Sequence, residues 1–331
     1  MPALSTLVLV LNLAAISATQ SPPDGIAGQI AAARSLVDQG KPAEAITSLS
    51  VLDRSDPRVA ELLGVAYYHA DDFAHAIEAL APIVSKLASD SIERREAEQV
   101  LGLSYYLAGR LPEALPLLEQ TSRWATDNIQ LAQVLGMAYI QTRQPDKARA
   151  ALARAFGVDP ASAGAHLLAA QMMIRIEFFE MADAELREAL TLEPRLPRAN
   201  FLLGENAIYR NRIEEGVASL EKELALNPTD AMSLYRIGEA WSRRAAWDKA
   251  IPPLQRSIWI NPFFSGPYIV LGRAYVATGK PDAAEGMLRH AVELDPNNKA
   301  AHYLLGQVFQ RLGKAEQAKE QFEIASKLSE K

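Results

Sequence analysis

Apolar and small residues recur along this chain with a step of 34 residues, apart from one step of 38. The most regular positions form a glycine column, in which alanine replaces glycine once: Gly64, Gly102, Gly136, Ala170, Gly204, Gly238, Gly272 and Gly306. An apolar residue precedes each member, leucine or phenylalanine follows sixteen residues later, and proline follows twenty-four residues after five of them. Apolar residues three and four apart form a stripe on one side of a helix, so each period predicts two amphipathic helices.

The glycine column and the prolines each have a physical reason in such a pattern. A small residue at a helix crossing lets two backbones approach closely, and proline cannot continue a helix, so it separates one period from the next. Residues that tolerate a positive φ stand seven positions after four column members, where the chain must reverse: Gly109, Asn211, Gly279 and Gly313. Gly40 takes the same place after Ala33 in a preceding, more degenerate period. The 38-residue step predicts an enlarged loop at Ser85–Ser91.

These columns resemble the tetratricopeptide repeat, a helix–turn–helix unit of 34 residues. The tryptophan that this family often carries near the start of the first helix is absent here. The resemblance implies an all-α fold, a right-handed superhelical solenoid of antiparallel helix pairs with about nine repeats over residues 26–331. We expect the repeats near 26–56, 57–94, 95–128, 129–162, 163–196, 197–230, 231–264, 265–298 and 299–331.

The first 25 residues differ from the rest of the chain. Residues 3–18 are largely apolar and uncharged, and Ser17, Ala18 and Thr19 are small. We interpret residues 1–20 as a secretory signal peptide or a short membrane anchor and residues 21–25 as a linker. A buried extra helix is a third interpretation of the same stretch.

Composition and motifs argue against catalysis, nucleic-acid binding and a cofactor. The chain has 34 basic and 40 acidic residues, a net charge of -6 and no cysteine. An acidic chain is a poor partner for nucleic acid, and without cysteine there is no thiolate metal site, disulfide or cysteine nucleophile. The five histidines lack metal-ligand spacing, and the common catalytic motifs are missing. We therefore expect a non-enzymatic protein without a cofactor or a metal.

The resemblance implies that five first-helix positions line an inner groove that binds a peptide or a protein. They lie six and three residues before the glycine-column residue and one, four and five residues after it. In the C-terminal repeats these positions hold five arginines and four aromatic residues against Glu205 and Glu239, an excess of three positive charges that favours an acidic partner. The expected binding residues are Arg175, Arg198, Phe201, Tyr209, Tyr235, Arg243, Arg273, Tyr303 and Arg311. In the N-terminal repeats the same positions carry little charge: Tyr68, Leu103, Tyr106, Leu107, Met137 and Ile140. The Lys and Asn residues that clamp chaperone tails in some family members are absent.

The leading interpretation is a protein-interaction scaffold, secreted or periplasmic in a bacterial envelope. The alternatives are a membrane-tethered cytoplasmic adaptor that organises an enzyme complex and a chaperone for exported polymers such as polysaccharide. Membrane contact is expected only through an uncleaved N-terminal segment. We also expect a monomer, because the last helix, near Lys314–Glu330, has a polar outer face that would cap the solenoid.

Overall fold

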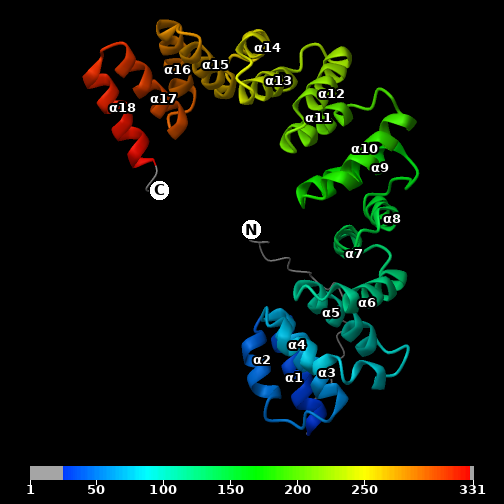
Figure 1. The fold of residues 1–331 in the computed structure, drawn as a ribbon. Helices are drawn as coiled ribbons and strands as arrows, with labels where there is room; N and C mark the ends of the chain where they lie inside the picture. Colours follow the sequence, from blue (N-terminus) through cyan, green and yellow to red (C-terminus); the bar gives the residue numbers. More distant parts are fainter. Residues whose placement is uncertain (1–24, 329–331) are drawn as a thin grey trace. The chain divides into compact units, whose positions relative to one another are not determined.

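The computed structural model describes residues 25–328, and all regular structure in that range is helical (Figure 1). The described residues form eighteen α-helices and the short 3-10 helix η1, Val84–Lys86, with no strand. The prediction of an all-α fold is thereby confirmed. The helices group into two compact units, of which unit 1 ends at Ala161 and unit 2 begins at Ser162.

Unit 1 contains four helix pairs and η1. Its helices are α1 (Ile26–Asp38), α2 (Pro42–Leu49), α3 (Pro57–His69), α4 (Phe73–Leu80), α5 (Ile92–Leu107), α6 (Leu111–Trp124), α7 (Ile129–Gln141) and α8 (Pro145–Ala155). Helix η1 lies in the enlarged loop that the 38-residue step predicts. Helix α5 begins at Ile92, three residues before the expected start of the third repeat.

Unit 2 contains five helix pairs. Its helices are α9 (Ala163–Arg175), α10 (Phe179–Leu192), α11 (Ala199–Tyr209), α12 (Ile213–Leu226), α13 (Ala231–Arg243), α14 (Trp247–Ile260), α15 (Ser265–Ala277), α16 (Pro281–Leu294), α17 (Lys299–Arg311) and α18 (Ala315–Lys327). In both units we call the odd-numbered helix of a pair the first helix and the even-numbered one the second helix.

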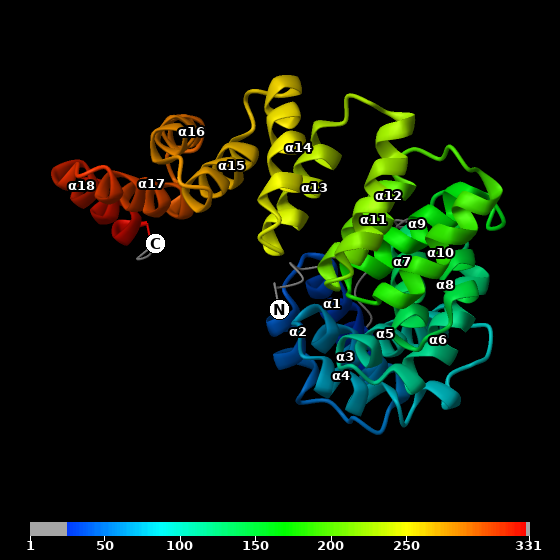
Figure 2. The same cartoon turned by 45° about the horizontal axis from the view of Figure 1, so that its top comes forward.

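The packing of the helices gives each unit an inner side. Each first helix packs most closely on the second helix of its own pair, and within each unit that second helix packs on the next first helix. Figures 1 and 2 both show α13 and α14 side by side, and α17 and α18 likewise. Neighbouring first helices such as α13 and α15 also contact each other, whereas neighbouring second helices are not among the closely packed pairs. First helices therefore line the inner face of each unit.

The glycine column marks the crossing of the two helices in a pair. A Cβ atom built on Gly238 would lie 2.4 Å from Cγ of Leu254, and one on Gly204 would lie 2.6 Å from Cγ of Leu220. Both leucines stand sixteen residues after their glycine and are fully buried. The two recurrent positions of the sequence are thus two sides of one contact.

Three residues separate the helices of each pair, and the middle one has a positive φ in all nine pairs of the described residues. Five of these positions are the glycines and Asn211 that the sequence pattern picked out. The other four carry side chains that rarely adopt this conformation: Asp71, Arg143, Glu177 and Ala245. The three-residue reversal therefore imposes this backbone conformation whether or not glycine is present.

The expected signal peptide or membrane anchor at residues 1–20 and most of the linker at 21–25 lie outside the described residues. Within residues 25–328, no helix combines the length and the apolar character needed to cross a membrane.

Candidate partner-binding face of unit 2

The residues expected to bind a partner all lie on, or directly beside, the first helices of unit 2. Arg175 ends α9, Arg198 precedes α11 and Tyr209 ends it, whereas Arg273 lies within α15. The remaining members lie on α11, α13 and α17: Phe201, Tyr235, Arg243, Tyr303 and Arg311. Because first helices form the inner side of the unit, we call the surface of α9, α11, α13, α15 and α17 the inner face of unit 2.

Tyr235 lies near the middle of the inner face and is half-buried. Its ring meets that of Phe264 edge-on, with 4.9 Å between the ring centroids. Burial raises the pKa of the Tyr235 hydroxyl, and the Glu239 carboxylate raises it further. Three nearby guanidinium groups oppose this rise, those of Arg236, Arg243 and Arg273. An aromatic side chain, one carboxylate and three arginines therefore share one small region.

Arg236 is a functional candidate that the sequence pattern did not pick out. Its Nε donates to Glu205 at 2.8 Å and its Nη1 donates to Glu239 at 2.9 Å. Arg236 stands two residues before Gly238, outside the five groove positions that the resemblance supplies, and only the direction of its side chain brings it here. Both glutamates that were expected to offset the positive charge are thus engaged by one arginine.

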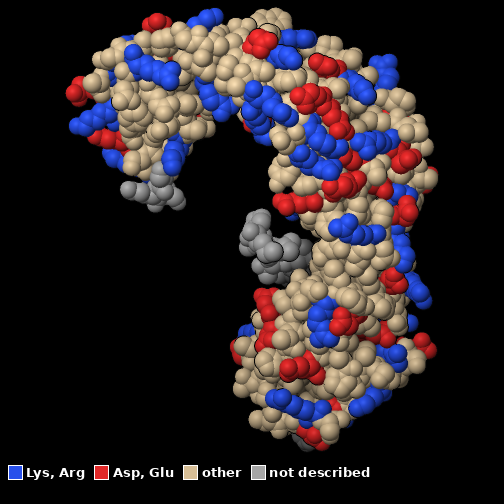
Figure 3. Space-filling view, viewed as in Figure 1, with Lys and Arg blue, Asp and Glu red and all other residues tan. Residues whose placement is uncertain are grey.

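Arg243 and Arg273 are exposed and less fully engaged. Nη2 of Arg243 lies 3.6 Å from a Glu239 oxygen, and Nη2 of Arg273 donates to the Ser242 hydroxyl at 2.8 Å. No carboxylate of the described residues lies within 4.0 Å of the Arg273 guanidinium. With Arg236 added to the five predicted arginines, six arginines stand against two glutamates, and Figure 3 shows basic side chains over α11 and α13 with acidic side chains between them.

Phe201 does not serve as an exposed anchor. It exposes only 4% of its surface and packs with Ile208 and Val217 in the core of unit 2. The guanidinium carbon of Arg198, a residue with φ of 67°, lies 4.9 Å from the Phe201 ring centroid. Rotation of α11 within its packing turns this position inward, so Arg198 and not Phe201 meets solvent there.

The other predicted residues are accessible but separated along the inner face. Tyr209 is 64% exposed and packs on Phe179, with 4.7 Å between ring centroids. Tyr303 is 50% exposed, and Nη1 of Arg311 donates to the carbonyl of Val276 at 3.3 Å. Arg175 is exposed at the end of α9. The structure brings Tyr235, Arg243 and Arg273 together, and the rest flank them.

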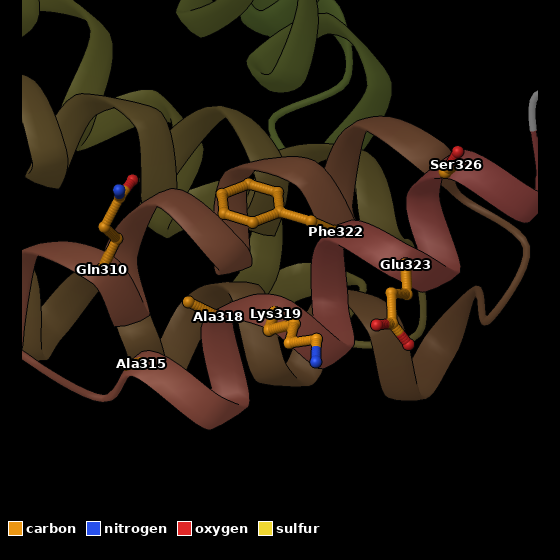
Figure 4. Close-up of a pocket in the computed structure, with 7 residues that line it drawn as sticks. All are labelled: Gln310, Ala315, Ala318, Lys319, Phe322, Glu323 and Ser326. Carbon is orange, nitrogen blue, oxygen red and sulfur yellow. The ribbon is translucent and has the colours of Figure 1, made fainter.

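A shallow hollow of about 460 Å³ lies beside Phe322 where α17 meets α18 (Figure 4). Lys319 and Glu323 of α18 carry their charged ends away from the Phe322 ring. Lys319 stands at the repeat position that holds Val217 and Ile251 in two earlier second helices but Glu285 in the preceding one, so a charged residue here is not specific to the last repeat.

Unit 1 offers a different inner face. Of the residues expected to line it, Leu103 and Ile140 are buried in the core, Tyr68, Tyr106 and Met137 are half-buried, and Leu107 is 42% exposed. The apolar surface expected in the N-terminal half is therefore only partly accessible.

The expectation of little charge in the N-terminal half is wrong. Nη1 of Arg34 donates to both oxygens of Glu96 at 2.8 Å, and Nη2 donates to Glu61 at 3.1 and 3.2 Å. Both carboxylates are buried, and burial raises the pKa of Glu61 to about 8, against the lowering effect of Arg34. We call these three residues the Arg34 cluster. It joins α1, α3 and α5. Glu61 and Glu96 occupy groove positions, three residues before Gly64 and six before Gly102, so their charge was visible in the sequence, whereas Arg34 lies in the first repeat, which lacks a column glycine.

Comparison with known proteins identifies the repeats of this chain. Two models described as tetratricopeptide repeat match residues 30–91, 105–172 and 275–327. No curated protein matches the chain. MamA 41-end from Desulfovibrio magneticus RS-1 is similar at 24% identity and a TM-score of 0.48, over 51% of this chain and 95% of that one.

Two further solved structures are similar at lower identity. YrrB, described as a TPR protein with an unusual peptide-binding site, is 21% identical with a TM-score of 0.45, over 51% of this chain and 88% of its own. The APC/C hetero-tetramer Cut9–Hcn1 is 16% identical with a TM-score of 0.44, over 86% of this chain and 56% of its own. Because the repeat models together match more than half of the residues, and the described helices pair as the repeat requires, this chain belongs to the tetratricopeptide repeat family.

Proposed function

We propose that this protein is a non-enzymatic interaction scaffold that holds a peptide or a segment of a partner protein on the inner face of unit 2. Tetratricopeptide repeats are protein-interaction modules, which supports the general class. The sequence also carries no catalytic motif, so the proposal assigns no reaction to the chain.

One observation carries the choice of surface. The inner face of unit 2 exposes tyrosine and arginine side chains on successive repeats, Tyr209, Arg243, Arg273 and Tyr303, whereas Leu103 of unit 1, at the same repeat position as Arg273, is buried. Tyrosine and arginine are enriched among the residues that dominate binding energy in protein interfaces. A partner segment along unit 2 would bury these side chains without disturbing the core.

Site-specific photo-crosslinking tests this location. A pull-down from the native envelope fraction, followed by mass spectrometry, first identifies the partner. A photoreactive phenylalanine analogue then replaces Tyr209 or Tyr303, and in matched controls it replaces Trp259 or Phe263, which are both 82% exposed near the end of a second helix. We expect the partner to crosslink at Tyr209 and Tyr303 only. Crosslinking at the control positions, or only at Tyr106 of unit 1, would move the binding surface elsewhere.

The proposed location is the secreted or periplasmic side of a bacterial envelope, supported by the apolar, uncharged stretch at residues 3–18. The alternative is a membrane-tethered cytoplasmic adaptor that keeps this stretch as an anchor. Sequencing the N-terminus of the mature protein separates the two, because cleavage would leave a chain that begins near Thr19. A chain that begins at residue 1 or 2 contradicts the exported form.

A further inference from the structure

The acidic residues in the middle of the inner face of unit 2 already pair with an arginine of the same face. Glu205 and Glu239 share the Arg236 guanidinium, at 2.8 and 2.9 Å, across two consecutive repeats. Nη2 of Arg243 lies 3.6 Å from a Glu239 oxygen, beyond hydrogen-bond distance. The charge of Arg243 therefore offsets the remaining negative charge of the two glutamates, while its N–H groups stay available to a ligand.

Arg273 is held in place by a neutral group. It donates to the hydroxyl of Ser242, the residue next to Arg243, at 2.8 Å across the repeat boundary. The same hydroxyl donates to the carbonyl of Glu239 at 2.7 Å, so its hydrogen is engaged and its lone pairs are left to accept from Arg273. The guanidinium of Arg273 is thereby positioned without being neutralised, and both arginines are exposed.

We propose that Arg243 and Arg273 form an anion site that binds side-chain carboxylates of an acidic segment in the partner. This inference rests on the proposed function and adds the chemical class of the segment. A guanidinium presents donors in a planar fork that fits a carboxylate with two hydrogen bonds. The Tyr235 ring, packed against Phe264, supplies an apolar wall beside the site. The rest of the chain is acidic, so the local positive charge also orients an acidic segment toward this face.

Binding of short fluorescent peptides to the full chain tests the site. The main probe is an amidated peptide with glutamate at alternate positions. Three relatives carry glutamine instead of glutamate, glutamine with a free C-terminal carboxylate, or phosphoserine in place of one glutamate. We expect the glutamate peptide to bind, with an affinity that falls as salt is added, and the amidated glutamine peptide to bind far more weakly. Tight binding only of the free-acid or only of the phosphoserine peptide would overturn the assignment to side-chain carboxylates.

A pair of charge-matched variants separates the site from the general charge of unit 2. R243Q/R273Q removes the proposed site. R244Q/R256Q removes two other exposed arginines, of which Arg244 lies 3.8 Å from Glu214 and Arg256 donates to the carbonyl of Pro228. We expect the first variant to weaken binding of the glutamate peptide by about tenfold and to reduce its salt dependence, and the second to change the affinity by less than about twofold.

The outcomes distinguish this inference from the function on which it rests. Equal weakening in both variants, or in neither, would overturn the anion site. The partner would still crosslink at Tyr209 and Tyr303 in that case, so the proposed function would stand. Loss of crosslinking at those two positions in the unaltered chain would instead overturn the proposed function itself.

Discussion

Replacing Glu61 by glutamine should make unit 1 less sensitive to pH, because the Arg34 cluster holds two buried carboxylates against one guanidinium. Glu61 is 2% exposed, and both of its oxygens accept from Nη2 of Arg34. Glutamine has nearly the same shape and keeps one oxygen to accept from Arg34. It cannot ionise, so it leaves the remaining pair of Arg34 and Glu96 electrically balanced.

The expected magnitude follows from the pKa of Glu61, which burial raises from 4.5 to about 8. A group whose pKa is higher in the folded state binds more protons there, so its contribution to stability is complete at low pH and is lost as the pH rises toward the folded-state pKa. Each pH unit in that interval removes roughly 1.4 kcal/mol. His69 acts in the opposite direction below its ordinary pKa of 6.5, because burial lowers its pKa. Between pH 6.5 and 8 the effect of Glu61 is therefore not offset by His69. Over this range the free energy of unfolding of the unaltered chain should fall by roughly 2 kcal/mol relative to that of E61Q.

Hydrogen exchange measured by mass spectrometry can follow this pH dependence in the helices that carry the Arg34 cluster. Opening free energies of α1, α3 and α5, corrected for the intrinsic exchange rate, should fall with rising pH in the unaltered chain and stay nearly level in E61Q. E98Q is the matched control, because Glu98 is also buried on α5 but pairs with Arg94 and Gln120. E98Q should keep the pH dependence of the unaltered chain. Parallel pH profiles for E61Q and the unaltered chain would refute the reasoning.

Three further predictions concern packing and the end of the chain. A245G should raise the free energy of unfolding by about 0.5–1 kcal/mol in denaturant titrations, because Ala245 has a φ of 53°; a decrease would contradict the strain argument. G238A should lower it by about 1–3 kcal/mol, because the new Cβ meets Leu254, whereas G286A, with no atom within 4 Å, should cost nothing. Deleting residues 314–331 should expose the buried Phe309 and cause aggregation in light scattering; a soluble monomer would argue against a capping role for α18.

The sequence by itself determined the helix pairs and the place where each pair crosses. Gly204 and Gly238 recur at a fixed distance from Leu220 and Leu254 because each repeat is a local unit whose two helices must touch at one point. This contact between residues sixteen apart recurs from repeat to repeat. It therefore produces a periodic pattern that a single sequence is enough to reveal. The same holds for the glycines at the centre of the three-residue turns.

Tertiary structure alone decided which side chains on the inner faces are available. Phe201 occupies a groove position in the repeat pattern yet is buried, and Arg236 lies outside those positions yet joins two glutamates. The rotation of each first helix depends on the volumes of the side chains packed around it, and these differ from repeat to repeat. The Arg34 cluster joins residues 27 and 62 positions apart. Such contacts form once in the chain, so they leave no periodic trace, and only the packing of α1, α3 and α5 brings the three charges together.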